Sequence, residues 1–382
     1  MTEQATGRRP STGRRVHHID PASMVVAVEA TRLAREVRGI GRYVRALLPR
    51  LVAQRANLRL ILFVRNLNDG DRIRALFDDT VQSRVDIRTV GSMTRSGADI
   101  FWYPWNTTGP TPRRGCAVVT MHDVVPIAHP DPRLRGTYKN LRWRIKYRAA
   151  AKRADLIITD SQFSADEIHR TLGVRHERMR VVLLAADDFD PIDEANDAAL
   201  LAKLGVTRPY MLAVGAGDQR KNLSLLDKAM PIVHDAMPDL TLVLAGPRRK
   251  HAGGRETWRR TLGFVSDAEL AALFRGAHAL VQPSMYEGFG LPVLEAMQFG
   301  TPVICAYASS LPEVAGDAAA WIDPHDPEEL ARVMIDIASD PARREQMSAA
   351  GHAQATRFSW DKTARETLEA FDDVRALYKP SR

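Results

Sequence analysis

The sequence predicts an α/β protein made of two Rossmann-like domains, each built around a parallel sheet. Short β-branched and aliphatic runs alternate along the chain with longer amphipathic segments, which is the pattern of strand and helix units around parallel sheets. These runs fall into two series separated by an acidic stretch that contains prolines. With 382 residues, 45% of them hydrophobic, the chain is long enough for each domain to bury a core.

The predicted strands can be placed one by one in chain order. The first series is Met24 to Glu29, Leu60 to Val64, Ala117 to Met121, Asp155 to Thr159 and Arg180 to Leu184, and the second is Tyr210 to Val214, Leu240 to Ala245, Ala279 to Gln282 and Pro302 to Cys305. The segment 186–208 between them predicts a linker with one short helix. Trp360 to Tyr378 predicts an amphipathic terminal helix that packs on either domain.

This pattern divides the chain into four parts. We predict a disordered basic tail at 1–20, Rossmann-like domains at 21–190 and 208–358, and a helical segment at 359–382 for which a return to the N-terminal domain is one arrangement. Arginine pairs occur in the tail, but no apolar segment follows them, so a secretory or twin-arginine signal is not expected.

Composition and charge exclude several classes of protein. No apolar run approaches the roughly 20 residues of a membrane span, and Cys116 and Cys305 form neither a CxxC pair nor a cluster with histidines, so we expect a cytosolic protein without a zinc site. The net charge of +8 suits nucleotide phosphates, lipid-linked phosphates or an anionic membrane surface, or reflects solubility alone. No basic helix or aromatic RNA-binding motif is evident, which disfavours a nucleic-acid binder.

Two glycine-rich turns follow predicted strands and open predicted helices. The turns Gly39-Ile40-Gly41-Arg42-Tyr43 and Gly215-Ala216-Gly217-Asp218-Gln219-Arg220 would let backbone amides approach an anion at a helix N-terminus. Both miss the GxGxxG fingerprint, because Val44 and Arg220 stand where its third glycine would be, so an NAD enzyme is disfavoured. Ordinary structural turns are the alternative interpretation.

Two cations follow the second glycine turn. Arg220 and Lys221 precede a predicted helix for which Asn222 is the expected N-cap. Such a pair suits a pyrophosphate, because an arginine binds it with two hydrogen bonds and a lysine supplies a point charge. An exposed helix start with ordinary surface charges is the alternative.

The most informative stretch runs from Pro283 to Ile304. Glu287 lies on a loop that leaves a strand, and Gly288 and Gly290 expose backbone amides before a helix, which predicts an anion site. Glu295 lies about one turn inside that helix, where a carboxylate can accept two hydrogen bonds from a diol such as a ribose. Taken singly, Glu287 fits a solvated loop residue and Glu295 fits a complement to the helix dipole.

This stretch resembles the Glu-x7-Glu signature of family 4 retaining glycosyltransferases, which have the GT-B fold of two Rossmann-like domains facing each other across a cleft. The resemblance covers nearly the whole chain, in order and in spacing. It is carried by Gly39 to Tyr43, Met121-His122-Asp123-Val124-Val125-Pro126, Thr159-Asp160-Ser161, Gly217 to Asn222, Gly263-Phe264-Val265-Ser266, Glu287 to Ile304, Leu311-Pro312-Glu313 and Phe358-Ser359-Trp360.

The resemblance implies a donor site on the C-terminal domain and an acceptor site on the N-terminal domain. Glu295 would hold the ribose of a nucleotide-sugar, and Arg220 and Lys221 would neutralise the diphosphate leaving group. Many members carry an arginine nearer to Gly215, whereas here Arg220 directly precedes the lysine. The donor-binding residues implied are Gly41, Gly217, Arg220, Lys221, Phe264, Val265, Glu287, Gly288, Phe289, Gly290, Leu291 and Glu295.

The same resemblance implies a catalytic set of His122, Asp123, Lys221 and Glu287. Glu287 would bind the transferred sugar and stabilise positive charge at its anomeric carbon. His122 would contact the sugar or the acceptor, and Asp123 would orient it or act on the acceptor hydroxyl. Retention would proceed by front-face attack, with a donor phosphate oxygen taking the acceptor proton; the sequence identifies no side chain as nucleophile and leaves a covalent intermediate open.

No metal ion or other cofactor is expected, because cationic side chains and helix N-termini would neutralise the diphosphate. The run Asp188-Phe189-Asp190 spells DxD, the metal motif of another glycosyltransferase class, but its place in the linker indicates a chance match. The aromatic run Phe101 to Trp105 fits either an acceptor-facing wall or core packing.

The function implied is transfer of a hexose, with mannose from GDP-mannose favoured, to a glycan or lipid-linked glycan in bacterial polysaccharide synthesis, at the inner face of the cytoplasmic membrane with at most peripheral contact. A UDP- or dTDP-sugar is the alternative donor. A GT-B isomerase or phosphorylase and a non-catalytic nucleotide- or glycan-binding subunit are the rival readings; Lys221, Glu287, Glu295 and His122 argue against the last.

Overall fold

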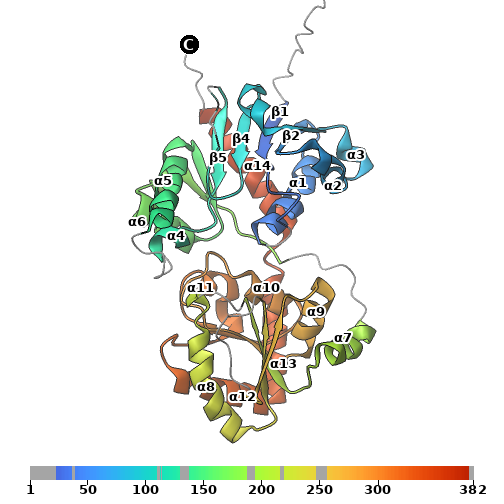
Figure 1. The fold of residues 1–382 in the computed structure, drawn as a ribbon, viewed down its shortest axis with the longest axis vertical. Helices are drawn as coiled ribbons and strands as arrows, with labels where there is room; N and C mark the ends of the chain where they lie inside the picture. Colours follow the sequence, from blue (N-terminus) through green and yellow to red (C-terminus); the bar gives the residue numbers. More distant parts are fainter. Residues whose placement is uncertain are drawn as a thin grey trace, which may run out of the picture.

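The computed structural model describes residues 23–36, 39–109, 112, 114–129, 137–186, 194–215, 219–246 and 256–377. Figure 1 shows two α/β lobes, one above the other along the long axis of the molecule. Each lobe contains a parallel sheet, which confirms the predicted fold class. The predicted basic tail at 1–20, Gly217, and the DxD match at 188–190 lie outside the described residues.

The N-terminal sheet has seven strands among the described residues, in the order β3-β2-β1-β4-β5-β6-β7. All are parallel, and Val26 of β1 lies between Leu60 of β2 and Ile100 of β4. The strands are β1 (Met24–Glu29), β2 (Leu58–Val64), β3 (Val85–Thr89), β4 (Ile100–Tyr103), β5 (Cys116–Thr120), β6 (Leu156–Thr159) and β7 (Met179–Val181). The helices of this lobe are α1 (Ile40–Gln54), α2 (Gly70–Arg74), α3 (Asp79–Gln82), α4 (Val125–Ala128), α5 (Tyr138–Arg153) and α6 (Gln162–Leu172).

The C-terminal sheet has six parallel strands among the described residues, in the order β10-β9-β8-β11-β12-β13. They are β8 (Tyr210–Val214), β9 (Thr241–Ala245), β10 (Arg259–Gly263), β11 (Ala279–Gln282), β12 (Val303–Ala306) and β13 (Ala319–Ile322). The helices that follow β7 are α7 (Asp197–Leu204), α8 (Leu223–Ala236), α9 (Asp267–Gly276), α10 (Leu291–Gln298), α11 (Leu311–Ala315), α12 (Pro327–Ser339), α13 (Pro341–Ala355) and α14 (Trp360–Leu377).

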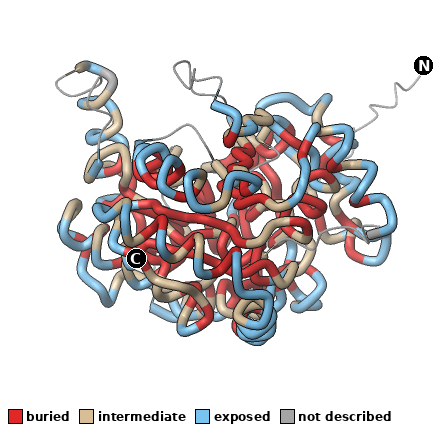
Figure 2. Tube along the Cα trace, turned by 90° about the horizontal axis from the view of Figure 1, so that it is seen from below, coloured by how far each residue is buried: buried red, intermediate tan, exposed pale blue. Residues whose placement is uncertain are grey.

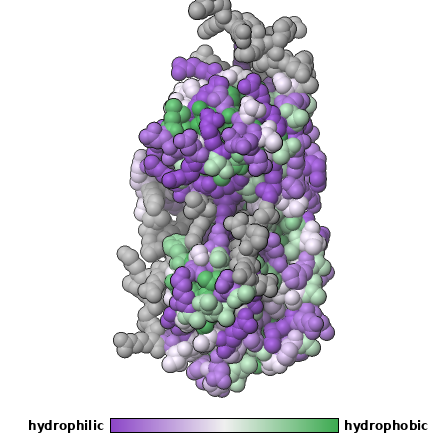
Figure 3. All heavy atoms as spheres, turned by 90° about the vertical axis from the view of Figure 1, so that its right-hand side faces the viewer, coloured by the Kyte–Doolittle hydropathy of each residue, from purple (hydrophilic) through white to green (hydrophobic). Residues whose placement is uncertain are grey.

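The strands of both sheets are largely buried because helices cover the two faces of each sheet. Buried segments run through the middle of the molecule and exposed segments surround them (Figure 2). The side of the molecule seen in Figure 3 is mostly hydrophilic, with small hydrophobic patches in both lobes. A parallel sheet buried in this way requires nearly continuous aliphatic strands, and that is the signal the sequence carries.

Four strands are not predicted from the sequence. Three of them, β3, β10 and β13, lie at sheet edges. In β3 and β10, polar residues such as Arg88 and Arg260 break the apolar run, whereas β13 is a short run of four apolar residues. The fourth, β4, is central and aromatic. The side chains from Phe101 to Trp105 are buried, and Trp102 donates through Nε1 to Thr120 Oγ1 at 2.8 Å. The aromatic run therefore packs in the core, and the predicted alternative of an acceptor-facing wall is wrong.

The segment between the two strand series contains the predicted short helix. This helix, α7, is attached to the C-terminal domain, because Arg275 of α9 donates two hydrogen bonds to the Asp197 carboxylate, at 2.6 and 2.7 Å.

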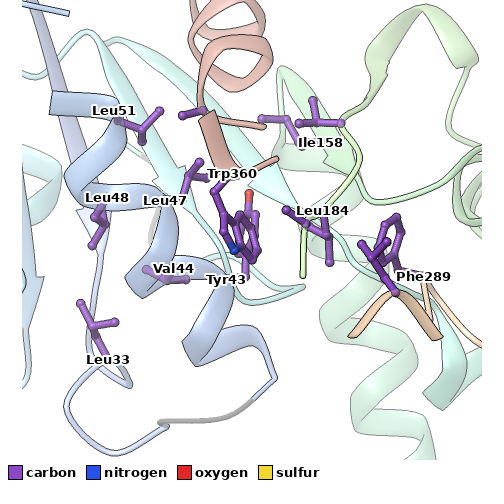
Figure 4. Packing of buried hydrophobic residues seen from close by; sticks show 14 of the residues in the cluster. Leu33, Tyr43, Val44, Leu47, Leu48, Leu51, Ile158, Leu184, Phe289 and Trp360 are labelled. Carbon is purple, nitrogen blue, oxygen red and sulfur yellow. The ribbon is translucent and has the colours of Figure 1, made fainter. Parts of the chain in front are cut away.

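The last helix, α14, leaves the C-terminal domain and packs in the N-terminal lobe beside α1 (Figure 1). Phe371 meets the Trp102 ring edge-on at a centroid distance of 5.8 Å. At the start of the helix, Trp360 lies beside Tyr43 of α1, with ring centroids 6.3 Å apart (Figure 4). The two domains are thus joined by two chain crossings, of which the second is held by aromatic packing.

In each sheet the order of strands changes direction between two neighbours, β1 and β4 in one and β8 and β11 in the other. In open parallel sheets, ligands bind outside the carboxyl ends of the strands at such a switch point. The loop after β8 carries Lys221, and the loop after β11 carries Glu287. The fold alone therefore brings these two residues to the place where a ligand is expected.

Candidate active site

Lys221 and Glu287 form an ion pair at the switch point of the C-terminal sheet. The distance from Lys221 Nζ to Glu287 Oε1 is 2.6 Å, and Gln282, the last residue of β11, donates through Nε2 to the same oxygen at 2.6 Å. The backbone of Glu287 is also held, because its N–H donates to Ser309 Oγ at 3.0 Å and its carbonyl accepts from Ser310 Oγ at 3.0 Å. The carboxylate is therefore fixed in position.

The charge of Glu287 is set by opposing influences. Burial raises the pKa of this carboxyl group, but the charge and hydrogen bond of Lys221, a hydrogen bond from Ser284 and the charge of Arg220 outweigh it. The net result is a pKa below the ordinary value of 4.5. Glu287 is thus an ionised, buried carboxylate at neutral pH.

The first turn of α10 presents the second glutamate of the block. Gly290 has φ of 115° at the N-cap of this helix, a conformation that favours glycine, and no side chain caps the helix there. Glu295, one turn further, is 5% exposed, and its Oε1 lies 3.4 Å from Nη1 of Arg42 on α1. Arg42 also pairs with Asp267 at the start of α9. One arginine of the N-terminal domain thus contacts two carboxylates of the C-terminal domain.

His122 lies at the carboxyl end of β5 with both ring nitrogens engaged. Nδ1 is 2.7 Å from Asp160 Oδ2, and Nε2 is 3.2 Å from the carbonyl oxygen of Pro104. Burial lowers the pKa of His122, but the charge and hydrogen bond of Asp160 and the Pro104 carbonyl raise it, and the net shift is upward. Because a carboxylate and a carbonyl both accept, this arrangement suits an imidazolium that donates from both nitrogens.

Asp123 lies beside His122 and faces the other domain. Its Oδ1 accepts from the Val125 N–H at 3.0 Å, and burial raises the pKa of its carboxyl group. The positive charge of Arg220 lowers the pKa of Asp123, as it lowers the pKa of Glu287. Arg220 therefore lies close enough to influence carboxylates of both domains.

Direct hydrogen bonds join the two domains next to these residues. The carbonyl oxygen of Gly288 accepts from Ser161 Oγ at 2.7 Å and lies 3.0 Å from Ser164 Oγ. A Cβ atom added to Gly288 would lie 2.8 Å from the carbonyl oxygen of His122, so only glycine allows this approach. Close by, the two carboxylate oxygens of Glu313 accept from the N–H groups of Gln162 and Phe163, each at 2.7 Å, at the N-terminus of α6.

Comparison with known proteins agrees with this arrangement. Residues 37–188 match the sequence pattern described as Glycosyltransferase Family 4, and residues 201–354 match the one described as Glycosyl transferases group 1. The chain is 35% identical over 271 residues to the O-antigen chain mannosyltransferase B of Escherichia coli, a match that covers 67% of this chain and 70% of that protein. The chain belongs to glycosyltransferase family 4.

One further relative of this glycosyltransferase is matched over only about a third of its own length. The chain is 28% identical over 289 residues to the serotype-specific mannosyltransferase WbdA of Escherichia coli, which covers 70% of this chain but 33% of WbdA. Among solved structures, sucrose-phosphate synthase from Thermosynechococcus elongatus superposes with a TM-score of 0.68 at 18% identity, over 93% of this chain and 100% of that one. The predicted GT-B fold is confirmed.

The structure brings most of the implied donor residues of the glycosyltransferase to one edge of the sheet. Gly288, Gly290 and Leu291 follow Glu287, the partner of Lys221, in the same loop and helix start. Gly41 has a steric reason to be glycine, because a Cβ atom there would lie 1.7 Å from the carbonyl oxygen of Glu36. The donor-binding roles of these residues remain predictions.

Three further implied residues differ in exposure. Phe264 follows β10 with its ring exposed, whereas Val265 is buried. Phe289 is buried, and its ring packs edge-on against Phe358 at 6.0 Å, so its side chain belongs to the core and only its backbone faces the loop.

One local prediction is wrong. Asn222 stands at the N-cap of α8, but it has a left-handed φ of 50° and its side chain makes no capping bond. Its Nδ2 donates instead to the Pro324 carbonyl at 2.7 Å. The backbone turn that carries Lys221 is thus attached to the loop after β13.

The sequence pattern predicts no role for several residues of the site. They are polar side chains that hold the predicted ones: Arg42, Asp160, Gln282, Ser309, Ser310 and Glu313. Two of them carry a signal that could have been used, because Gln282 ends a buried strand and Asp160 directly follows one. A polar residue at that place usually serves a site at the sheet edge.

Within the described ranges, no cluster of three or more His, Cys, Asp or Glu side chains is placed to hold a metal ion.

Proposed function

We propose that this family 4 glycosyltransferase transfers mannose from GDP-mannose, with retention of configuration, to a lipid-linked glycan. The observation that carries the reaction is the pairing of Lys221 with the buried carboxylate of Glu287 at the switch point, with the charge of Arg220 acting on the same group. The choice of mannose is supported by the names of the relatives, two of which are mannosyltransferases of Escherichia coli.

The site has a separate group for each part of the donor. Lys221 and Arg220 would receive the diphosphate, whose negative charge grows as the bond from the anomeric carbon to the phosphate oxygen breaks. Glu295 would accept hydrogen bonds from the ribose, in place of its ion pair with Arg42. Glu287 would then face the sugar, where its charge stabilises the oxocarbenium character of the transition state.

Retention would follow from attack on the face that the leaving group occupies. The acceptor oxygen forms the new bond to the anomeric carbon, and its proton passes to an oxygen of the departing diphosphate. Neither Glu287 nor His122 is then required as a nucleophile or a base. The ring of His122 fits this mechanism, because both of its nitrogens are already engaged by Asp160 and Pro104.

Neutralisation by Lys221, Arg220 and the start of α10 would also replace a divalent cation, so the proposed reaction needs no metal ion. The acceptor would approach from the N-terminal domain, past Asp123, at the inner face of the cytoplasmic membrane. Within the described residues, no helix has both the length and the apolar character to span a bilayer. Contact with the membrane would then be peripheral.

Thermal unfolding in the presence of nucleotides tests the donor. A ligand that binds only the folded state raises the melting temperature, so GDP should stabilise the protein more than UDP, ADP or dTDP, with or without EDTA. Lys221→Ala should remove the stabilisation. A selective response to UDP or dTDP would replace the proposed base, and a response abolished by EDTA would contradict the metal-free site.

The reaction itself is tested by product analysis. With GDP-mannose and a mannose-terminated glycan as acceptor, proton NMR should show an α-linked product formed from the α-configured donor. A β-linked product would contradict retention. No transfer to any glycan, together with nucleotide binding, would favour the non-catalytic subunit.

A further inference from the structure

Helix α5 is basic along its whole length. Seven of its sixteen residues are lysine or arginine and none is acidic: Lys139, Arg142, Arg144, Lys146, Arg148, Lys152 and Arg153. The helix lies on the outside of the N-terminal lobe (Figure 1). The expectation from the sequence that the chain has no basic helix is therefore wrong. The apolar residues interspersed among the cations hide the pattern when the chain is read linearly.

The same helix exposes its large apolar side chains to solvent. Tyr138 is 79% exposed, Leu141 is 55% exposed and Ile145 is 59% exposed. Their spacing of three and four residues places them along one face of the helix. The opposite face, with Tyr147 and Ala150, is buried against the domain. The apolar stripe is therefore not part of the core.

The charges of α5 are available to a partner. Among the residues that the structure describes, no ion pair involves an α5 side chain. The neighbouring helix α6 carries two carboxylates, but Asp166 accepts from Gln162 at 2.8 Å, and Glu167 accepts twice from Arg170 at 2.8 Å. The outer face of α5 thus combines exposed aliphatic side chains with uncompensated positive charge.

We propose that this face of α5 docks on the surface of an anionic lipid bilayer. Tyr138, Leu141 and Ile145 enter the boundary between headgroups and acyl chains, while the flanking arginines and lysines contact lipid phosphates. A helix with these two kinds of side chain lies in the plane of the membrane, held by apolar burial and by electrostatic attraction together.

A nucleic acid fits this face less well. Phosphate binding would use the cations but would leave Leu141 and Ile145 in water, and single-strand binding relies on several exposed aromatic rings on which successive bases stack, whereas Tyr138 is the one such ring among the described side chains of this face. The tryptophan of the helix, Trp143, is half-buried and packs against Tyr147 at 6.1 Å and under the ammonium of Lys146. The apolar stripe is explained by lipid and not by nucleic acid.

Docking through α5 would also orient the active site. The short helix α4 follows His122 and Asp123 in the chain and packs against α5. A bilayer bound at α5 would then lie on the same side of the molecule as Asp123, past which a lipid-linked acceptor would enter. This consequence rests on the proposed function, whereas the docking face does not.

Vesicle co-sedimentation of the full chain tests the proposal. Vesicles of phosphatidylcholine mixed with phosphatidylglycerol should bind the protein, vesicles of phosphatidylcholine alone should bind it weakly, and high salt should weaken the first interaction. Replacing Leu141 and Ile145 by serine should lower the partition coefficient about ten-fold for each side chain. Arg144→Gln and Arg148→Gln should lower it about five-fold each.

Matched controls lie on α8 in the other domain. Ile232 is 42% exposed and Lys228 is exposed on the same helix, so Ile232→Ser and Lys228→Gln change the same kinds of side chain and should leave vesicle binding unaltered. Equal loss in the α5 and α8 variants, equal binding to neutral and anionic vesicles, or binding to single-stranded DNA in place of vesicles would overturn the proposal.

The nucleotide thermal shift keeps this test separate from the proposed function. The α5 variants should retain the wild-type shift, because the helix is remote from Lys221 and Glu295 in the chain and belongs to the other domain. Vesicle binding without any nucleotide response would refute the donor site and leave the docking face intact. A nucleotide response without vesicle binding would refute the docking face and leave the donor site intact.

Discussion

Replacing Lys221 by methionine should destabilise the protein and reverse the pH dependence of Glu287. The substitution keeps the length of the side chain but removes the ammonium that lies 2.6 Å from the carboxylate. The two side chains are 15% and 11% exposed, so solvent screens their interaction little. After the change, burial remains as the largest influence on Glu287, and its pKa should rise above 4.5.

The size of the effect follows from the burial of the pair. Removing one partner of a buried ion pair costs about 3–5 kcal/mol, and we expect the lower end, about 3 kcal/mol, because Arg220 still acts on Glu287. For a domain of roughly 150–250 residues this lowers the melting temperature by roughly 6–12 °C. In the double variant with Glu287→Gln both charges are gone, and most of the loss should be recovered.

The pH dependence has a definite sign. In the wild type, the depressed pKa of Glu287 contributes stability that is present above pH 4.5 and is lost as the pH falls through the lower folded-state value. In Lys221→Met the pKa lies above 4.5, so the deficit relative to wild type should be largest at neutral pH and should shrink on acidification.

Circular dichroism melts of the three proteins between pH 4.5 and 7.5 measure these effects, since 4.5 is the ordinary pKa of the glutamate. Lys203→Met is the matched control, because Lys203 also pairs with a glutamate of this domain, Glu269, but is 71% exposed. The control should lose less than about 1 kcal/mol. Equal losses in Lys221→Met and Lys203→Met, or a deficit that does not change with pH, would refute the assignment of a buried pair.

Three further predictions concern the N-terminal domain and its contacts. The raised pKa of His122 contributes stability that is present below pH 6.5 and is lost as the pH rises through the folded-state value. The melting temperature of wild type relative to that of His122→Gln should therefore fall with rising pH. A difference that stays constant with pH would contradict an imidazolium at this position. Glu313→Gln should weaken the contact with α6 by about 1–2 kcal/mol. Small-angle scattering should then show a larger radius of gyration for the variant than for wild type. An unchanged radius would show that this carboxylate does not hold the domains together. Gly288→Ala should push the loop away from His122 and lower kcat/KM by about ten- to hundred-fold in a transfer assay, and wild-type activity would show that the close approach is unnecessary.

Much of the fold could be predicted because its signal is local. Strands β1, β8 and β11 begin and end at the predicted residues, since a strand buried on both faces is a continuous apolar run bounded by polar turns. The edge strands β3 and β10 could not be found in this way. One face of such a strand meets solvent, and charged residues such as Arg88 and Arg259 interrupt the pattern.

The residues expected at the site also carry a local signal. Glu287 directly precedes Gly288 in a loop after a strand, Lys221 follows a glycine-rich turn, and Glu295 lies one turn inside the helix that opens at Gly290. The sequence could not show that Gln282 and Lys221 donate to the same carboxylate oxygen of Glu287. Nor could it show that Arg42 contacts Glu295 from the other domain. Those contacts depend on where separate loops meet in space.

The α/β class, the two strand series and the positions of the glycine turns can be derived from the sequence alone, because each depends on residues within one short window. The folded molecule is needed to show that α14 returns to the N-terminal lobe, that the aromatics of β4 are core, and that α5 turns an apolar and basic face to solvent. Each of these facts concerns which face of an element is covered. An amphipathic or aromatic segment can be covered in several ways, and the choice is made by elements distant in the chain that compete for the same surface.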